Sequence, residues 1–517
     1  MKHLLPFFLV AASVITAAAV PPPPEDLEPN FDQPEGTTYL LSRDCEAFEI
    51  EAYEAIHGRC YGSIVEITDG DDGAVYFSYI ISSYPASTYI KGERTADGKV
   101  VIKGPQALYE EYDYDYDKFT MLYLVPLVQY IDENNRGYYI ASEDMEYVFD
   151  VKEDGTLVSE DPTKLLGICT WTYLRWLEEE GYYWTGWGDR DITISRPTGE
   201  LVTPPADIAS EKWVWEDEYE TTVVNVMFDD KDVYIQGMDR ILPNAWLKGS
   251  VTADNEISFP SGQFMGASME DLYFHYFCGG EFTEVAVPDE DTTETQWSLK
   301  GAAAFRYDAE KRHMHDLSGY VINGSPDKLY PLYGYHDVTI EHQDRNPECP
   351  PAAPYDLVFQ EDDLGKRLWV QIPNTDTEGM MLDEANLYYE IFLDGEPYEL
   401  DIDYPGIEEH PTWVPYNFEN DDVFIYGKDH TIYFYTEGED SYGIRSVYVN
   451  EMGQVLYSAA CGDCGNSLVA GVKADVESVV WYDLTGRRIE APAKGVSIRS
   501  VRYSDGSLKS EKVMVLP

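Results

Sequence analysis

Basic residues are scarce in this chain. Of its 517 residues, 36 are Lys or Arg and 96 are Asp or Glu, which gives a net charge of −60. The segment Lys473–Pro517 departs from this balance, because it carries eight basic and six acidic residues. A surface this acidic repels phosphate groups, so we expect neither nucleic acid nor anionic lipid as a partner. The charge by itself favours solubility.

Long hydrophobic runs are missing, apart from one at the start. Leu4–Thr16 is apolar, follows a short basic start and precedes Ala17-Ala18-Ala19. This run is too short to span a bilayer, and the pattern predicts a secretory signal peptide at residues 1–19. No cysteine follows until Cys45, so lipoprotein acylation is not expected. After signal-peptide removal we expect no transmembrane segment.

Sequence motifs of common enzymes are also missing. The chain has no Gly-x-Ser-x-Gly elbow, no His-Glu-x-x-His, no phosphate loop and no dinucleotide fingerprint. We therefore favour a function without catalysis. An enzyme stays open as an alternative, because the two carboxylates of a glycan hydrolase come together only in the fold.

Cysteines number seven, an odd count that cannot pair fully within one chain. Cys45 and Cys60 could staple a loop. Cys461-Gly-Asp-Cys464 could close a disulfide, bind metal or do redox chemistry, but a zinc site needs a second pair of ligands at suitable spacing. A structural pair or two idle thiols is the interpretation we favour, and no cofactor is expected.

Aromatic residues are abundant, with 42 Tyr, 19 Phe and 11 Trp. Disordered acidic chains lack such content, so the chain is predicted to fold. Aromatic and β-branched residues in short runs are typical of strands. The predicted fold class is therefore all-β. The exception is Leu165–Glu180, a stretch that reads as a helix ended by Gly181.

An internal repeat divides the first two thirds of the chain. At an offset of 157 residues, both segments read as a strand, a tight turn and a strand. The matched pairs are Tyr89 with Trp246, Lys91 with Lys248, Gly92 with Gly249, Asp97 with Asp254, Val100 with Ile257, Ile102 with Phe259, and Gln106 with Gln263. We expect two tandem antiparallel β domains, at 40–203 and 206–346.

Proline clusters and turn signals give the remaining boundaries. A Pro-rich stalk is predicted at 20–39, after the signal peptide. Residues 350–458 contain several short strands, including two that flank the turn Asp394-Gly395. This pattern indicates a β-sandwich, which faintly resembles a fibronectin type III domain.

The last segment, 475–517, has a motif of its own. It reads Trp481-Tyr482-Asp483-Leu484-Thr485-Gly486-Arg487-Arg488, then Gly495-Val496-Ser497-Ile498, then Gly506, and ends with Lys512-Val513-Met514-Val515. This resembles the C-terminal sorting domain of the type IX secretion system, although Ser497 stands where that family usually has an aromatic residue. The residues that carry the resemblance are Tyr482, Asp483, Gly486, Arg487, Gly495, Gly506, Lys512, Val513 and Val515.

The resemblance implies a small C-terminal β-sandwich, a route of export and a cellular location. Proteins of this family pass through the periplasm and are exported by the type IX secretion machinery, which would be a partner of this chain. The implied location is extracellular or on the outer-membrane cell surface. The repeat unit also looks similar to a module of surface proteins that carry such tails, and it brings no activity with it.

Two groups of residues could bind ligands. Asp113, Asp115 and Asp117 alternate with tyrosines, so their carboxylates would share one strand face. They could hold calcium, but solvated acids on an exposed face are the interpretation we favour. The second group could stack on sugar rings or, as we favour, fill a β core; it consists of Trp171, Trp176, Trp184 and Trp187.

The sequence favours a modular surface or secreted protein that binds a glycan, or a host or matrix protein. Two copies of a domain could add avidity. An extracellular glycan hydrolase and a structural surface-layer component remain the alternatives.

Overall fold

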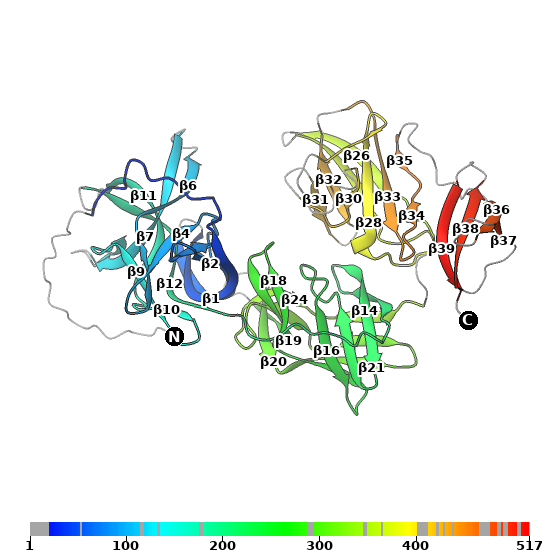
Figure 1. Ribbon diagram of the computed structural model, residues 1–517, viewed down its shortest axis with the longest axis horizontal. Coiled ribbons are helices and arrows are strands. Elements are labelled where there is room, and N and C mark those ends of the chain that lie inside the picture. Colours follow the sequence, from blue (N-terminus) through cyan, green and yellow to red (C-terminus); the bar gives the residue numbers. More distant parts are fainter. Residues whose placement is uncertain are drawn as a thin grey trace. The chain divides into compact units, whose positions relative to one another are not determined.

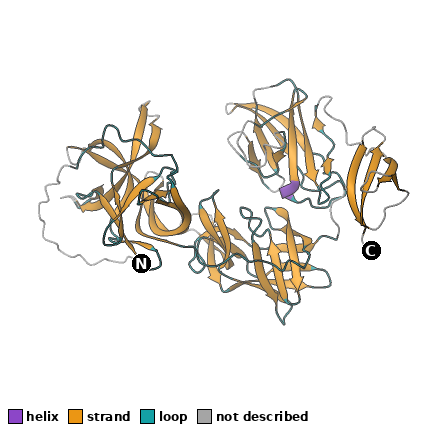
Figure 2. Cartoon of the chain, in the orientation of Figure 1, coloured by secondary structure: helices purple, strands orange, loops and turns teal. Residues whose placement is uncertain are grey.

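The protein is almost entirely β-sheet in its computed structural model (Figures 1 and 2). The structure describes residues 20–51, 54–113, 118–131, 135–174, 179–286, 293–344, 349–362, 365–400, 412–419, 423–427, 430–436 and 439–464, and the backbone of 476–482, 488–489, 495–503 and 508–515. Within these ranges the helical element is a single 3₁₀ turn, Glu384–Asn386. The predicted all-β class is confirmed. No helix in these ranges has the length and apolar character needed to cross a membrane.

The chain divides into two compact units, which are described separately. The first contains Met1–Ser210 and Asn225–Val338, and the second contains Glu211–Val224 and Thr339–Pro517. Strand pairs in both units are antiparallel, for example β1 with β2 in the first unit and β28 with β33 in the second.

The first repeat domain is built on twelve strands. They are β1 (Gly36–Glu51), β2 (Glu54–Gly70), β3 (Ala74–Ser78), β4 (Ile90–Arg94), β5 (Lys99–Lys103), β6 (Gln106–Asp113), β7 (Lys118–Ile131), β8 (Gly137–Ala141), β9 (Glu146–Val151), β10 (Leu157–Ser159), β11 (Leu165–Leu174) and β12 (Glu179–Ser195). Successive pairings join β1, β2, β3, β4, β5, β9, β10 and β12, and β12 returns to β1. These eight strands therefore close a ring, which we call the first barrel.

Alternation of side chains fills the first barrel. Its core includes Val75, Phe77, Val100 and Ile102, all essentially buried. Because side chains alternate across a strand, one residue in two from each strand enters this core. The N-terminal segment predicted as a stalk lies on this domain. Val20 packs against a second hydrophobic cluster of the domain, which includes Phe48 and Leu127 and which we call the side cluster. In addition, Tyr89 N donates to Asn30 O at 2.8 Å.

The predicted helix at Leu165–Glu180 is wrong. This stretch contributes β11 and the start of β12, which pair as a hairpin from Leu165↔Arg190 to Leu174↔Glu179. Leu165 and Ile168 are buried in the sheet, where a neighbouring strand supplies the backbone hydrogen bonds. Tertiary pairing overrode the local helix preference of the leucine and glutamate residues.

The second repeat segment supplies thirteen strands. They are β13 (Glu211–Glu216), β14 (Thr221–Asp229), β15 (Asp232–Gln236), β16 (Trp246–Val251), β17 (Glu256–Pro260), β18 (Gln263–Ser268), β19 (Tyr273–Ala286), β20 (Thr293–Lys300), β21 (Ala302–Asp308), β22 (His313–Asp316), β23 (Tyr320–Asn323), β24 (Pro331–Tyr335) and β25 (Thr339–His342). Within the first compact unit the strands β14, β15, β16, β17, β21 and β22 pair in that order, and within the second unit β13 pairs with β25.

The third segment forms two facing sheets. One has the order β26 (Tyr355–Asp362), β27 (Gly365–Gln371), β32 (Thr431–Tyr435) and β31 (Val423–Tyr426). The other contains β28 (Leu387–Leu393), β29 (Glu396–Pro397), β30 (Val414–Pro415), β33 (Tyr442–Val449), β34 (Val455–Tyr457) and β35 (Cys461–Gly462). A single core joins them, with Val370 from one sheet and Ile391 from the other. The arrangement is a β-sandwich.

The C-terminal segment shows four strands in its described backbone. They are β36 (Val476–Tyr482), β37 (Arg488–Ile489), β38 (Gly495–Tyr503) and β39 (Leu508–Val515), in the order β37-β36-β38-β39. The described part of this segment is thus one antiparallel sheet, and a second sandwich layer is not among the described residues.

Candidate functional site

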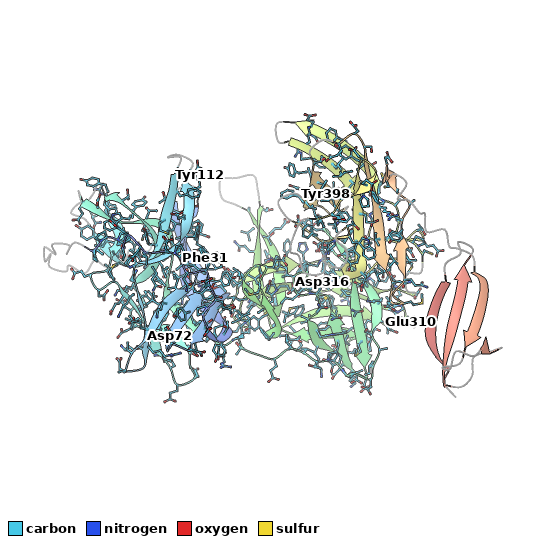
Figure 3. All side chains as sticks on the ribbon, turned by 45° about the horizontal axis from the view of Figure 1, so that its top comes forward. Phe31, Asp72, Tyr112, Glu310, Asp316 and Tyr398 are labelled. Atoms are coloured by element: carbon cyan, nitrogen blue, oxygen red, sulfur yellow. The ribbon has the colours of Figure 1, made fainter. Side chains whose placement is uncertain are left out.

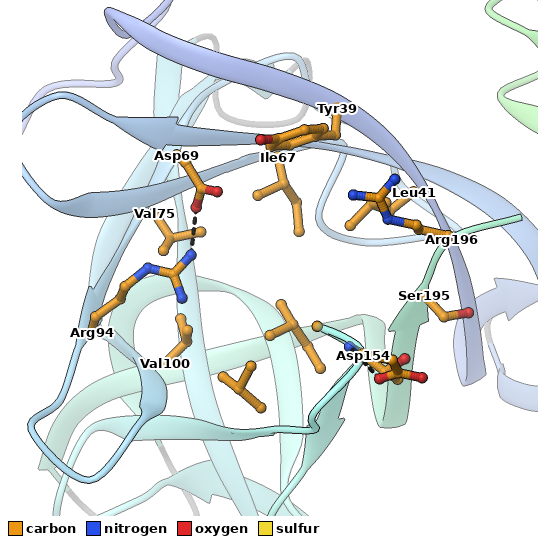
Figure 4. A pocket seen from close by; sticks show the side chains of 14 residues that line it. Tyr39, Leu41, Ile67, Asp69, Val75, Arg94, Val100, Asp154, Ser195 and Arg196 are labelled. Carbon is orange, nitrogen blue, oxygen red and sulfur yellow. Dashed lines mark hydrogen bonds and ion pairs between the residues drawn. The ribbon is translucent and has the colours of Figure 1, made fainter.

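A pocket of about 190 Å³ lies at one end of the first barrel (Figure 4). Each of the eight barrel strands contributes at least one lining residue. They are Tyr39 and Leu41 (β1), Ile67 and Asp69 (β2), Val75 (β3), Arg94 (β4), Val100 (β5), Val151 (β9), Leu157 (β10) and Ser195 (β12), with Asp154, Gly155, Thr156 and Arg196 from adjoining turns. An eight-stranded barrel is just wide enough to be filled by side chains or to hold one small ligand.

The floor of this barrel-end pocket is apolar. Ile67, Val75, Val100 and Leu157 belong to the buried core of the barrel, and each is at most 5% exposed. Their rigid packing shapes the base of the pocket before any ligand arrives. A fixed apolar surface of this kind suits the C–H face of a ring-shaped ligand.

Polar groups form the rim of the pocket. Arg94 Nη2 donates to Asp69 Oδ1 at 2.5 Å, so these two charges neutralise each other (Figure 4). Across the pocket from Arg94 stands Arg196, an exposed residue (Figure 4). Within the described ranges, no hydrogen bond or ion pair holds Arg196. The rim thus offers one cation that is available to a ligand.

Asp154 is the other charged group at the rim. Its Oδ1 accepts a hydrogen bond from the backbone N–H of Thr156 at 3.0 Å. This backbone hydrogen bond lowers the pKa of Asp154, so the carboxylate stays ionised at neutral pH. A general acid needs the opposite shift, because it must hold a proton at the working pH. Asp154 is therefore suited to accepting hydrogen bonds from a ligand.

The second repeat does not reproduce this rim. The hairpin β16–β17 has the register Val251↔Ile257, which corresponds at the 157-residue offset to Arg94↔Val100 in β4–β5. Valine thus stands where the first copy has Arg94. The candidate site belongs to the first copy.

The sequence singled out four tryptophans, and the three that the structure describes do not form one surface. Trp171 and Trp184 are half-buried against one side cluster of the first repeat domain. Trp184 packs edge-on against Tyr139 with ring centroids 4.8 Å apart, and Trp171 packs likewise on Tyr182. These contacts are those of core-filling aromatics.

Trp187 belongs to a different cluster. It packs on the barrel core beside Tyr84, with ring centroids 5.4 Å apart. Its backbone carbonyl accepts a hydrogen bond from Trp184 Nε1 at 2.8 Å, so the side chain of Trp184 is fixed against its own strand, β12. Trp176 lies outside the described residues. Among the described residues of this hairpin, Tyr173 and Tyr183 have exposed rings.

The proposed calcium ligands cannot be placed together. Asp113 ends β6 with its side chain outside the described residues, and Asp115 and Asp117 lie outside them as well. In the described part of the chain, no group of three or more His, Cys, Asp or Glu is arranged to hold a metal ion. Calcium binding by the three aspartates stays a prediction.

The motif cysteines lie at the edge of the β-sandwich. Cys461 is in β35 and half-buried, whereas Cys464 is buried, and burial raises the pKa of its thiol to about 11. Both are free thiols in this structure. Their disulfide stays a prediction.

The sorting-motif residues fall partly on strands. Tyr482 ends β36, Gly495 begins β38, and Lys512, Val513 and Val515 lie on β39, with Gly495↔Val515 in register. Asp483, Gly486, Arg487 and Gly506 lie outside the described residues.

A second hollow of about 410 Å³ lies in the second compact unit. Its lining includes Glu216, Glu341, Asp344 and His342. The three carboxylates disfavour an anion, and the lining lacks the deep apolar floor of the barrel-end pocket. The barrel-end pocket is therefore the stronger candidate. Comparison with known proteins adds no assignment, because no protein-family model and no curated protein matches the sequence.

Proposed function

We propose that this protein is a secreted or cell-surface binding protein whose barrel-end pocket holds one sugar unit of a glycan. The observation that carries the proposal is the pairing of an apolar floor with the unpartnered guanidinium of Arg196. A sugar ring has an apolar C–H face and a polar edge, so both surfaces of the pocket are used. The volume suits a single terminal unit of a larger ligand.

Arg196 favours an acidic sugar within this class. A guanidinium binds a carboxylate through two parallel hydrogen bonds, which are stronger than hydrogen bonds between neutral groups. Arg94 is already neutralised by Asp69, so one ligand carboxylate matches the one available cation. The net charge of the chain is screened beyond about 8 Å at physiological ionic strength, so Arg196, and not the distant acidic residues, determines which charge the pocket attracts.

A glycan hydrolase is the competing function. It needs two carboxyl groups, one of which must keep a proton as general acid. In the pocket, Asp69 is held by Arg94, and the pKa of Asp154 is shifted in the wrong direction for an acid. Binding is thus better supported than hydrolysis at this site. A structural surface-layer role would require no ligand at all.

Export by the type IX system is part of the proposal and rests on the C-terminal motif. Deleting residues 475–517 should leave the protein in the periplasm, because the sorting motif is lost while the signal peptide remains. Cell fractionation and detection of the chain outside the cell measure this. Appearance of the deleted chain outside the cell would contradict it.

Ligand binding is tested on a glycan array with the full secreted chain, with and without calcium. We expect signals on glycans that end in acidic sugars. These signals should depend on calcium only if Asp113, Asp115 and Asp117 contribute to glycan binding. Silence across acidic and neutral glycans would contradict the proposal and favour a protein ligand or a structural coat.

A further inference from the structure

Two cysteines face each other across the first hairpin of the barrel. Cys45 on β1 is directly opposite Cys60 on β2, and the two side chains are 0% and 3% exposed. Directly opposed residues of an antiparallel pair have Cα atoms about 4.5–5.5 Å apart. A disulfide requires Cα atoms about 4.4–6.8 Å apart, so this pair already meets the requirement.

We propose that Cys45 and Cys60 form a cross-strand disulfide in the exported protein. The other buried cysteines of the repeats have no such partner. Cys169 is opposite Trp184 and Tyr123, and Cys278 is opposite Val321. Among the described cysteines of the two repeats, the proposal is therefore specific to one pair.

The surroundings make the two sulfur atoms unequal. The hydrogen bond from Cys45 and the nearby Arg43 guanidinium lower the pKa of the Cys60 thiol, and together they outweigh the effect of burial, which raises it. Burial raises the pKa of Cys45, whose Sγ lies 3.4 Å from the hydroxyl of Ser82. The direction of this shift favours Cys60 as the sulfur that attacks first, since the thiolate is the form that attacks a disulfide.

The reaction is a thiol–disulfide exchange with a disulfide-bearing oxidant. The Cys60 thiolate attacks one sulfur of the oxidant, whose S–S bond breaks, and a mixed disulfide forms while the departing thiolate takes a proton. Cys45 then loses its proton and attacks the Cys60 sulfur, which releases the second oxidant thiol. The chain loses two electrons and two protons, and the oxidant gains both as two thiols.

The second repeat covers the pair once the chain has folded. Tyr273 Oη lies 3.7 Å from Cys60 Sγ and 3.1 Å from Tyr330 Oη. Because this cover shields the sulfur atoms, we expect oxidation before the repeats pack together, in a compartment where thiol oxidants are present. The folded, reduced chain should react slowly with the same oxidant.

Peptide mapping tests the cross-link without any variant. The full chain, secreted into an oxidising compartment, is denatured with an alkylating agent and digested with trypsin without reductant. Cleavage after Arg43 and Arg59 places Cys45 and Cys60 on separate peptides, 44–59 and 60–91. We expect these two peptides joined and unalkylated. Their recovery as separate alkylated peptides would overturn the proposal.

Thermal unfolding gives a second readout. Reductant should lower the melting temperature of the wild-type chain by several degrees, because it releases a constraint on the unfolded state. The double substitution Cys45→Ala with Cys60→Ala should remove this response, and Cys169→Ala should keep it. A response that persists in the double variant would contradict the assignment. Neither the peptide map nor the response to reductant depends on glycan binding. Both therefore test the disulfide even if the protein binds no glycan.

Discussion

At the scale of single residues, His275 in β19 is a buried imidazole held between two carboxylates. Its Nδ1 lies 2.6 Å from Asp239 Oδ2 and its Nε2 lies 2.8 Å from Asp271 Oδ2, with the imidazole fully buried. Burial lowers the pKa of His275, but the hydrogen bonds to both carboxylates outweigh burial and raise it to about 9. The imidazole is therefore charged at neutral pH and donates from both nitrogens.

This network predicts a pH dependence of folding stability. The folded pKa of His275 lies above its unfolded value of about 6.5, so its contribution is complete below pH 6.5. It is lost as pH rises through about 9, and amounts to roughly 3 kcal/mol of unfolding free energy. His275→Gln should flatten this part of the pH profile in denaturant unfolding, whereas the exposed His315→Gln should not. An unchanged profile in His275→Gln would refute the charged network.

The pocket residues show why a site can escape sequence reasoning. Tyr39 and Arg196 are 157 positions apart, and the barrel closes them onto one rim only after eight strands have paired. Nothing local distinguishes Arg196 from the other basic residues. The tryptophans attracted attention because they are rare and clustered, but strand alternation turned Trp184 and Trp187 onto two packed clusters.

At the scale of elements, the repeated hairpins share details of contact. Gln106 Oε1 accepts from Lys91 N at 2.7 Å, and its Nε2 donates to Lys103 O at 2.9 Å. Gln263 makes the same two bonds, to Lys248 N at 2.8 Å and Pro260 O at 3.0 Å. The matched lysines also lie over Tyr76 and Tyr234, with Asp72 (labelled in Figure 3) and Asp232 as ion partners.

Removing the glutamine clamp should destabilise the hairpin. Gln106→Ala deletes three side-chain hydrogen bonds to backbone groups of the strand pair, with an expected cost of about 1–2 kcal/mol. Gln129→Ala, on an exposed position of β7, is the matched control and should cost less than about 0.5 kcal/mol. Denaturant unfolding measures both. Equal stability of the two variants would show that the clamp is unimportant.

Strands with strong turn signals were the predictable elements. Asp394 and Gly395 both have positive φ, and β28 and β29 pair directly on either side, as the dipeptide predicted. The helix prediction for Leu165–Glu180 failed because leucine and glutamate favour a helix locally, whereas β11 pairs with β7, a strand that lies well before it in the chain. Local preference cannot report a partner far away in the chain.

At the scale of the whole molecule, the two repeat segments pack closely within the first compact unit. Ile64 N donates to Leu272 O at 2.7 Å, and Lys328 Nζ lies 3.0 Å from Asp44 Oδ2. Gly62 has φ +75°, and a Cβ there would lie 1.8 Å from the carbonyl oxygen of Gly324. This contact therefore requires glycine.

Gly62→Ala should separate the two segments. The clash with backbone cannot be relieved by a side-chain rotation, so we expect a loss of several kcal/mol and faster proteolysis between the repeats. Gly98→Ala is the matched control, because it has φ +83° and open space around its Cβ. The control should show only backbone strain of about 1 kcal/mol. Similar losses in both variants would mean that the contact contributes little.

The central claim is tested most directly by calorimetric titration of the full secreted chain with oligosaccharides ending in glucuronic acid or in glucose. These ligands differ only in the carboxylate that Arg196 is proposed to bind. We expect tighter binding of the acidic ligand, a loss of about tenfold or more in Arg196→Gln, and no change in Arg306→Gln, an exposed arginine on β21. Equal affinity of wild type and Arg196→Gln, or no binding of either ligand, would contradict the account.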